Sequence, residues 1–292
     1  MSKRKDISKH SDRAGNGDAS GDSDEDFDML DVDFEWFDPQ PAVDFHGLKS
    51  LLRQLFDADS QLFELSALVD LILSQPTLGS TVKVDGNESD PFAFLSVINL
   101  RQHASNPAVQ TLIQYILTKA ASQPSLSALK SLLDPSSSAE VGLILTERFI
   151  NMPHEIVPPM YTMLQEEITW AIEDKEPYRF THYLVFSKTY IEVASKLDAD
   201  DSRPAKKKKG PKGANSSGGG VFYFHPEDEV LQKHAIGSGW FDYSKADDEG
   251  ASDSKRAFQE MGVKPSGHLI LLEADKFEPA VKAMGEYLSP QA

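Results

Sequence analysis

Three short stretches of the sequence contain residue types that occur in catalytic motifs. His154 and Glu155 match the start of the His-Glu-x-x-His pattern of zinc proteases, but Pro158 stands where the second histidine would be. Ser238 has a glycine on either side without the Gly-x-Ser-x-Gly spacing of a nucleophile elbow. The stretch 208–220 is rich in Gly and Lys but does not match the phosphate-binding pattern Gly-x4-Gly-Lys-Ser/Thr. We interpret all three as turns or linkers and assign no catalytic residue.

The sequence offers little for binding a metal or a redox group. It contains no cysteine, which excludes a disulfide framework, a Cys-ligated zinc or iron–sulfur site and a thiol nucleophile. The histidines are dispersed without metal-ligand spacing, so we interpret them as ordinary surface or core imidazoles. We therefore expect no bound metal and no cofactor. The histidines concerned are His46, His103, His154, His182, His225, His234 and His268.

Arg148 is a candidate ligand-binding residue because it follows the apolar stretch VGLIL. Such a run is typical of a buried central strand, and α/β sheets bind ligands at the carboxyl ends of their strands. The alternative is that Glu147 and Arg148 pair with each other and orient the next helix. We favour the local pair, since ion pairs of this kind are common.

The overall charge limits the classes of partner. The chain has 292 residues and a formal net charge of −17, which disfavours direct binding to nucleic acid or an anionic membrane and attracts basic proteins. The basic N-terminus is not followed by an apolar run, so it does not match a secretory signal. No stretch reaches the roughly 18 apolar residues of a membrane span. We expect a soluble, intracellular protein.

The stretch 22–38 combines acidic and large apolar residues. From 31 to 36 they alternate, with Val32, Phe34 and Trp36 on one side, which predicts a first strand with its acidic side chains facing water or a partner. The acidic residues either bind a basic partner or form a solubilising tail, and charge alone does not decide between these. The candidate partner-binding residues are Asp22, Asp24, Glu25, Asp26, Asp28, Asp31, Asp33 and Glu35.

A lysine-rich stretch from Arg203 to Lys212 stands out in this acidic chain. Extended, exposed lysines are what a nuclear import receptor recognises, and we favour that function over a solvated linker. The SKRK stretch at 2–5 is a weaker second candidate. The proposed import signal consists of Lys206, Lys207, Lys208, Lys209 and Lys212.

The elements that would position these residues alternate between helix and strand patterns. We expect a single α/β (α+β) domain over 29–292 with a mixed sheet, preceded by a disordered acidic tail over 1–28 and interrupted by a flexible insertion at about 198–220. A hairpin is predicted around 85–87 and a helix from Pro107, capped by Asn106. Further predictions are a strand near 141–151, a long helix entered through prolines, strands near 178–193, 221–225 and 267–277, and helices at 254–262 and 277–288.

The chain resembles the BCCIP family over about residues 30–290. The resemblance is most specific in FEWFD at 34–38, LTERFINMP at 145–153 and P-x-MY-x-x-L at 158–164. An acidic N-terminal stretch and a lysine-rich insertion before VFYFHPEDE at 221–229 are also typical of the family. The resemblance implies a fold similar to the GCN5-related N-acetyltransferases, with helices on both faces of a mixed sheet. It also implies a nuclear protein, whose fungal relatives are described as nuclear-export factors and ribosomal-protein chaperones.

This resemblance raises an enzymatic alternative. Acetyltransferases of that class hold the coenzyme A pyrophosphate with a Gln/Arg-x-x-Gly-x-Gly/Ala turn, whose backbone N–H groups bind it at a helix N-terminus. The corresponding segment here contains Pro153, Pro158 and Pro159, which donate no N–H. We therefore expect no enzyme but a carrier-chaperone that shuttles from nucleus to cytoplasm. Its expected partners are a basic large-subunit ribosomal protein, a nuclear transport receptor and a lipid kinase cargo. The alternatives are an acetyltransferase-like enzyme and a cell-cycle or DNA-repair scaffold.

Overall fold

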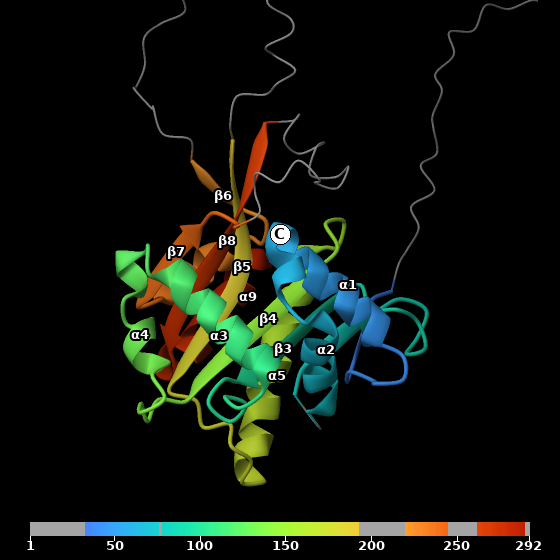
Figure 1. The fold of residues 1–292 in the computed structure, drawn as a ribbon. Helices are drawn as coiled ribbons and strands as arrows, with labels where there is room; N and C mark the ends of the chain where they lie inside the picture. The colour runs from blue at the N-terminus through green and yellow to red at the C-terminus, as the bar shows by residue number, and fades with distance from the viewer. Residues whose placement is uncertain (1–32, 76–77, 193–219, 245–261, 290–292) are drawn as a thin grey trace, which may run out of the picture. The chain divides into compact units, whose positions relative to one another are not determined.

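A mixed β-sheet runs through the centre of the molecule (Figure 1). The computed structural model describes residues 33–75, 78–192, 220–244 and 262–289, and the chain from Asp33 onwards forms one compact unit. The strand order is β1-β2-β3-β4-β5-β8-β7, and β6 pairs with β5 beside this path. Among the described strands, β4 and β5 pair in parallel and every other pair is antiparallel. The strands are β1 (Glu35–Phe37), β2 (Ser80–Lys83), β3 (Ala93–Asn99), β4 (Val141–Arg148), β5 (His182–Glu192), β6 (Val221–Tyr223), β7 (Gly237–Phe241) and β8 (Val263–Glu273).

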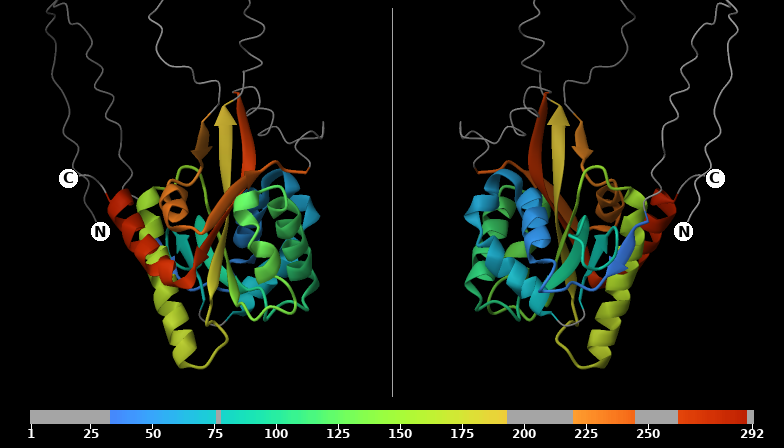
Figure 2. Two further views of the ribbon diagram at one scale, coloured as in Figure 1. Left: turned by 90° about the vertical axis from the view of Figure 1, so that its left-hand side faces the viewer. Right: turned by 90° about the vertical axis from the view of Figure 1, so that its right-hand side faces the viewer.

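Helices cover both faces of this sheet (Figure 2). Helices α1 to α4 pack on one face, and α5, α7 and α9 pack on the other. Within the described ranges, no helix combines the length and apolar character needed to cross a membrane. The helices are α1 (Phe45–Phe56), α2 (Leu65–Ser74), α3 (Pro107–Ala120), α4 (Leu129–Leu132), α5 (Val157–Glu173), α7 (Glu227–His234) and α9 (Ala274–Leu288), with 3-10 turns η1 (Asp57–Leu62), η2 (Pro124–Leu126) and η3 (His154–Ile156).

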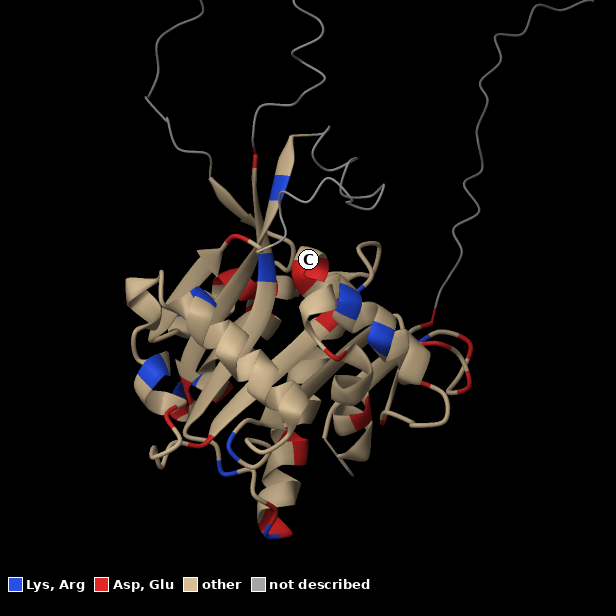
Figure 3. Cartoon of the chain, viewed as in Figure 1, with Lys and Arg blue, Asp and Glu red and all other residues tan. Residues whose placement is uncertain are grey.

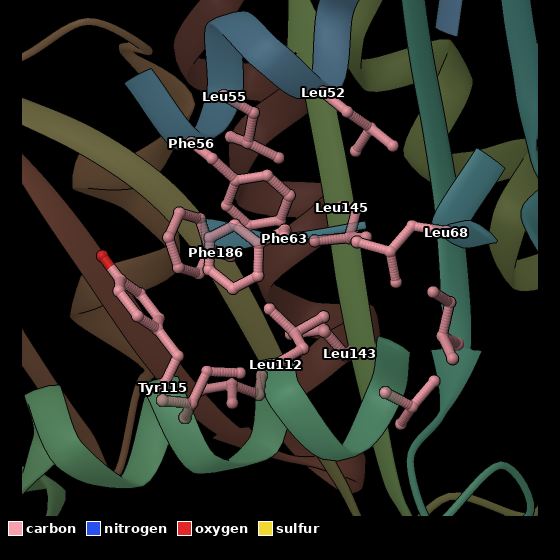
Figure 4. Packing of buried hydrophobic residues seen from close by; sticks show 14 of the residues in the cluster. Leu52, Leu55, Phe56, Phe63, Leu68, Leu112, Tyr115, Leu143, Leu145 and Phe186 are labelled. Carbon is pink, nitrogen blue, oxygen red and sulfur yellow. The ribbon is translucent and has the colours of Figure 1, made fainter. Parts of the chain in front are cut away.

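The central strands are apolar throughout because both of their faces are buried. In β4, Leu143 and Leu145 point to the α1–α4 face, and Ile144 points to the α5–α7–α9 face. Figure 4 shows Leu143 and Leu145 beside a group of aromatic rings, in which Phe56 of α1 meets Phe186 of β5 at a centroid distance of 5.0 Å. The predicted buried central strand is confirmed.

Local sequence signals define several other elements as predicted. The turn between β2 and β3 places Asp85 and Gly86 at φ values of 64° and 89°, so the hairpin around 85–87 is confirmed. Helix α3 begins at Pro107, and the Asn106 side chain accepts a hydrogen bond from the backbone N–H of Ala108. Helix α5 has Pro158 and Pro159 in its first turn, so the predicted long helix entered through prolines is confirmed.

The first strand is shorter than predicted, but its alternation is correct. β1 has three residues at the sheet edge, and Phe34 and Trp36 pack against the core beneath α5. Asp33 and Glu35 are exposed, as predicted, while Asp31 lies outside the described residues.

Two segments near the C-terminal half differ from the predictions. The stretch around Ser238 is the edge strand β7 and not a turn, because Gly237 and Gly239 let η2 lie directly against it. The predicted strand near 221–225 is β6, which ends at Tyr223, and residues 227–234 form helix α7, for which no prediction was made. The predicted helix at 254–262 lies almost wholly outside the described residues, and β8 begins at Val263, earlier than predicted.

The η2 turn also covers the outer edge of β7. The Ser125 hydroxyl donates to the carbonyl of Ser238 at 2.5 Å, and the Gln123 amide donates to the carbonyl of Trp240 at 2.6 Å. These bonds satisfy edge carbonyls that could otherwise pair with a strand of another molecule.

Alanine at Gly237 and alanine at Gly285 should change the stability of the protein in opposite directions. A Cβ atom at Gly237 would collide with the carbonyl oxygen of Ser125, whereas a Cβ atom at Gly285 in α9 would meet no atom within 4 Å. Gly237→Ala should lower the free energy of unfolding by about 1–3 kcal/mol. Gly285→Ala should raise it by about 0.5–1 kcal/mol, because alanine favours the helix. Urea unfolding of both variants measures this, and no loss for Gly237→Ala would contradict the close approach of η2.

Candidate functional site

The parallel strands β4 and β5 separate beyond the register pair Leu145 and Phe186. Both strands continue past this point, and charged side chains from three parts of the chain meet there. Strand β4 contributes two of them, β5 contributes one, and the start of α7 with the residue two positions before it contributes three. We call this group the polar cluster: Glu147, Arg148, Lys188, His225, Glu227 and Asp228, all of which are buried.

The ion pairs of the polar cluster lie on both faces of the sheet, because adjacent strand residues point to opposite faces. Glu147 faces the side of α1, where its Oε2 lies 2.5 Å from Lys188 Nζ. Arg148 faces α7, where its Nη1 and Nη2 lie 2.5 and 3.1 Å from the two carboxylate oxygens of Glu227. The predicted pair between the side chains of Glu147 and Arg148 is therefore wrong: the two side chains diverge and find separate partners.

His225 connects the two ion pairs. Its Nε2 lies 3.2 Å from Glu147 Oε1, and its Nδ1 lies 3.8 Å from Glu227 Oε1. Asp228 accepts a hydrogen bond of 2.5 Å from the Ser187 hydroxyl of β5. The polar cluster thus ties α7 to both central strands at the point where backbone pairing between them ends.

The electrostatics of the polar cluster keep its charges paired. Burial alone would raise the pKa of Glu147, but the positive charges of Lys188 and His225 outweigh burial and lower this pKa to about 2. Burial would lower the pKa of His225, but Glu147 outweighs it and the pKa is raised. Burial, with the nearby charge of Glu227, raises the pKa of Asp228 to about 7.

This arrangement leaves the strand ends filled by the chain itself. A general acid or base must reach a proton on a substrate, and the polar cluster residues are all turned inward and buried. In the part of the chain that the structure describes, no three His, Asp or Glu side chains are placed to hold a metal ion. The carboxyl end of β4, where an α/β sheet binds a ligand, is occupied by Arg148 and its partner Glu227.

The segment after β4 also differs from a phosphate-binding turn. No glycine lies between Arg148 and α5, and Pro158 and Pro159 occupy the first turn of that helix. A proline has no backbone N–H, so this helix start offers few donors to a pyrophosphate. His154 and Glu155 lie in this segment within η3, and both side chains are exposed.

The structure describes only two of the sequence-predicted site residues. Asp33 and Glu35 lie exposed beside and on the edge strand β1. The other predicted partner-binding residues and the predicted import signal lie outside the described residues: Asp22, Asp24, Glu25, Asp26, Asp28, Asp31, Lys206, Lys207, Lys208, Lys209 and Lys212.

Sequence reasoning missed most of the polar cluster. His225 was counted as an ordinary imidazole, and Lys188, Glu227 and Asp228 were not singled out. The available signal was the charge that interrupts apolar strands in TER at 146–148 and SKT at 187–189, together with HPED at 225–228. Burial also affects His268, whose pKa it lowers to about 4, so that this core imidazole is neutral at pH 7.

Removing one partner of the buried pair should destabilise the fold. Arg148→Met leaves Glu227 buried without its cation, and we expect a loss of about 3–5 kcal/mol in the free energy of unfolding. The double variant Arg148→Met/Glu227→Leu should be destabilised less than Arg148→Met alone, since no unpaired charge remains. Lys233→Met, which breaks the exposed pair with Glu229, serves as the control and should change little. Strictly additive effects in urea unfolding would contradict the interdependence of Arg148 and Glu227.

The protonation of His225 should make stability depend on pH. A histidine whose pKa is raised on folding stabilises the folded state below its unfolded pKa of 6.5, and this contribution is lost as pH rises through the folded pKa. Between about pH 6 and about pH 9, the free energy of unfolding of wild type should fall by on the order of 1 kcal/mol more than that of His225→Gln. Urea unfolding of both proteins at both pH values measures the difference. A parallel pH dependence for the two proteins would refute this role of His225.

Comparison with known proteins identifies the family. A family model described as BCCIP matches residues 29–231. Protein bcp1 of Aspergillus fumigatus is 63% identical and covers 92% of this chain and 91% of its own length. Protein bcp1 of Schizosaccharomyces pombe is 50% identical and covers 90% and 92%. The crystal structure of BCP1 from Saccharomyces cerevisiae matches with a TM-score of 0.60 at 26% identity, covering 90% of this chain and 92% of that chain. The resemblance found in the sequence is confirmed, and the chain belongs to the BCCIP family.

Proposed function

We propose that this protein is a non-enzymatic carrier and chaperone for a basic ribosomal protein of the large subunit. It binds its client, masks the client's RNA-binding surface and takes part in nuclear export and protein transport as it shuttles between nucleus and cytoplasm. A nuclear transport receptor and a lipid kinase cargo are its further partners. The observation that carries the proposal is the filled end of the central strands, which leaves the outer surface of an acidic protein to do the binding.

The place where a related enzyme would bind its cofactor supports the proposal. A mixed sheet with helices on both faces supports a likeness to the GCN5-related N-acetyltransferases. Enzymes of that class would bind the cofactor between the end of a central strand and the next helix. In this chain the strand end holds the Arg148–Glu227 pair, and the prolines at the start of α5 remove backbone donors. A fold can be kept while its site is lost, so the likeness in fold does not imply an acetyltransferase.

The charge of the chain supports a basic client. A net charge of −17 attracts a basic partner over a distance set by ionic strength, which speeds association and makes binding sensitive to salt. The exposed carboxylates of Asp33 and Glu35 extend this acidic character onto the folded body. We assign the carboxylates at 22–31 to the same capture step and the lysines at 206–212 to import.

The experiment that tests the proposal is affinity purification of the full-length protein from nuclear extract at low and at high salt. One basic ribosomal protein should be recovered in near-stoichiometric amount at low salt and should be lost or reduced at high salt. Absence of a basic client at both salt concentrations would overturn the proposal. Recovery of replication or repair proteins instead would support the scaffold, and binding in an acetyl-CoA titration would support the enzyme.

A charge variant sharpens this test. Replacing Asp22, Asp24, Glu25, Asp26 and Asp28 by their amides should reduce client recovery at low salt severalfold, since exposed ion pairs each contribute up to about 1 kcal/mol. The free energy of unfolding should stay unchanged. Replacing five exposed carboxylates of the folded body by amides removes the same number of charges and serves as the control: Glu64, Asp70, Glu88, Glu278 and Glu286. Equal recovery by both variants and wild type would contradict a role for the acidic stretch.

A further inference from the structure

Trp170 is an exposed aromatic residue on the outer face of α5. Its side chain faces away from the core, and the residue is 57% exposed, more than the other described tryptophans. Figures 1 and 2 show that the C-terminal part of α5 extends beyond the edge of the sheet, where neighbouring elements do not cover it. An exposed indole offers a large and rigid apolar surface to a partner, and its neighbours on the helix decide which partner fits.

Carboxylates surround this indole on the helix. Residues three and four positions apart are neighbours on a helical surface, and all four such positions around Trp170 are acidic. The side chain of Glu167 differs from the other three because it points inward and accepts a hydrogen bond of 2.7 Å from the backbone N–H of Gly79. The other three remain exposed, and we call them with the indole the α5 aromatic face: Glu166, Trp170, Glu173 and Asp174.

No cation pairs with the α5 aromatic face within the described residues. None of the ion pairs there involves Glu166, Glu173 or Asp174. None of the contacts between a lysine and an aromatic ring there involves Trp170. Figure 3 shows acidic segments along the projecting part of this helix, with a basic segment at its tip, where Lys175 follows Asp174. The face thus presents three carboxylates around an aromatic plane against one neighbouring lysine, which forms no ion pair with them.

We propose that the α5 aromatic face binds an arginine-rich segment of a protein partner. A guanidinium group is planar and stacks on an indole, while its N–H groups bond to carboxylates at the ring edge. The indole strengthens the choice of arginine, because a planar guanidinium group stacks on it and also forms bidentate bonds to carboxylates, which a compact ammonium group does not. This inference rests on the proposed function, because a basic ribosomal protein supplies such segments, and it adds a docking place on the folded body.

The neighbourhood of α5 extends the same charge. Burial is the largest cause that raises the pKa of the Glu167 carboxyl group. The charge of Asp38, which follows β1, raises this pKa further. Figure 2 shows β1 beside α5, and the exposed Asp38 follows this strand on the α5 side. Asp33 and Glu35 alternate with Phe34 and Trp36 and face away from α5, so a basic segment seated on α5 can continue toward Asp38 but not toward them.

The test uses the full-length protein and two labelled nonapeptides of equal charge, one alternating Arg with Gly and one alternating Lys with Gly. Fluorescence anisotropy gives the affinity for each peptide, and the ratio of the two is the readout. Other acidic stretches of the chain also bind both peptides, so the decisive quantity is the change in this ratio between wild type and Trp170→Ala. We expect wild type to prefer the arginine peptide about two- to fivefold, and Trp170→Ala to remove that preference.

Trp240→Ala is the matched control. Trp240 is also exposed, at 43%, but it lies on strand β7 and not among the carboxylates of a helix surface. This variant should keep the arginine preference. Glu166→Gln/Glu173→Gln should weaken the arginine peptide about two- to fivefold at low salt and less at high salt. Glu278→Gln/Glu286→Gln on α9, with the same change in net charge, should have a smaller effect. Circular dichroism and urea unfolding confirm that each variant is folded.

Several results would overturn the proposal. One is an arginine preference that survives Trp170→Ala, and another is equal loss in Trp170→Ala and Trp240→Ala. A change from dimer to monomer on Trp170→Ala in sedimentation would mean that a second copy of the chain occupies the face. A gain in peptide affinity on deleting residues 203–212 that is abolished by Trp170→Ala would mean that the lysine stretch of this chain occupies it, since a gain from net charge alone does not depend on Trp170.

The two proposals can fail separately. If nuclear extract yields no ribosomal protein but the arginine preference depends on Trp170, the docking face stands and the client is different. If a basic ribosomal protein is recovered equally by wild type and Trp170→Ala, and the peptide ratio is also unchanged, the carrier function stands and the docking face is wrong.

Discussion

The pairing of buried charges where β4 and β5 separate is the constraint on which much of this structure depends. Taking an ionised side chain out of water is costly unless an opposite charge and hydrogen bonds compensate it. Glu147 and Arg148 are adjacent on one strand and point to opposite faces, so each requires a partner on its own side. Lys188 meets the first requirement and Glu227 the second. His225 lies between the two pairs and joins them.

This constraint explains the order of elements after β5. Strand β6 pairs with β5, and α7 then begins at the open strand ends, with His225 just before the helix and Glu227 as its first residue. Without α7 in this place, Arg148 would be buried and unpaired on its face of the sheet. The ion pairs need only the fixed segment from β6 to α7.

Sequence reasoning identified the elements whose structure is determined by residues close to them in the sequence. Asn106 and Pro107 define the start of α3 from side chain and backbone chemistry, and the apolar run in β4 follows from burial on both faces. The errors arise where a distant segment decides. Gly237 lies in a strand because η2, more than a hundred residues earlier in the chain, packs against it. Glu227 pairs with Arg148 across a separation of 79 residues, and no local pattern in either segment indicates this contact.

The polar cluster and the outer face of α5 differ in whether their charges have partners within the described chain. In the polar cluster the ionised side chains pair with one another, so the binding that we propose uses groups on the outer surface. On α5 the inward residue Glu167 already has a backbone partner, whereas none of the described ion pairs involves its outward neighbours Glu166 and Glu173. In the docking that we propose, Trp170 adds apolar contact area to this charged surface. The same helix then holds the sheet with one side and binds the partner with the other, without using the buried strand ends.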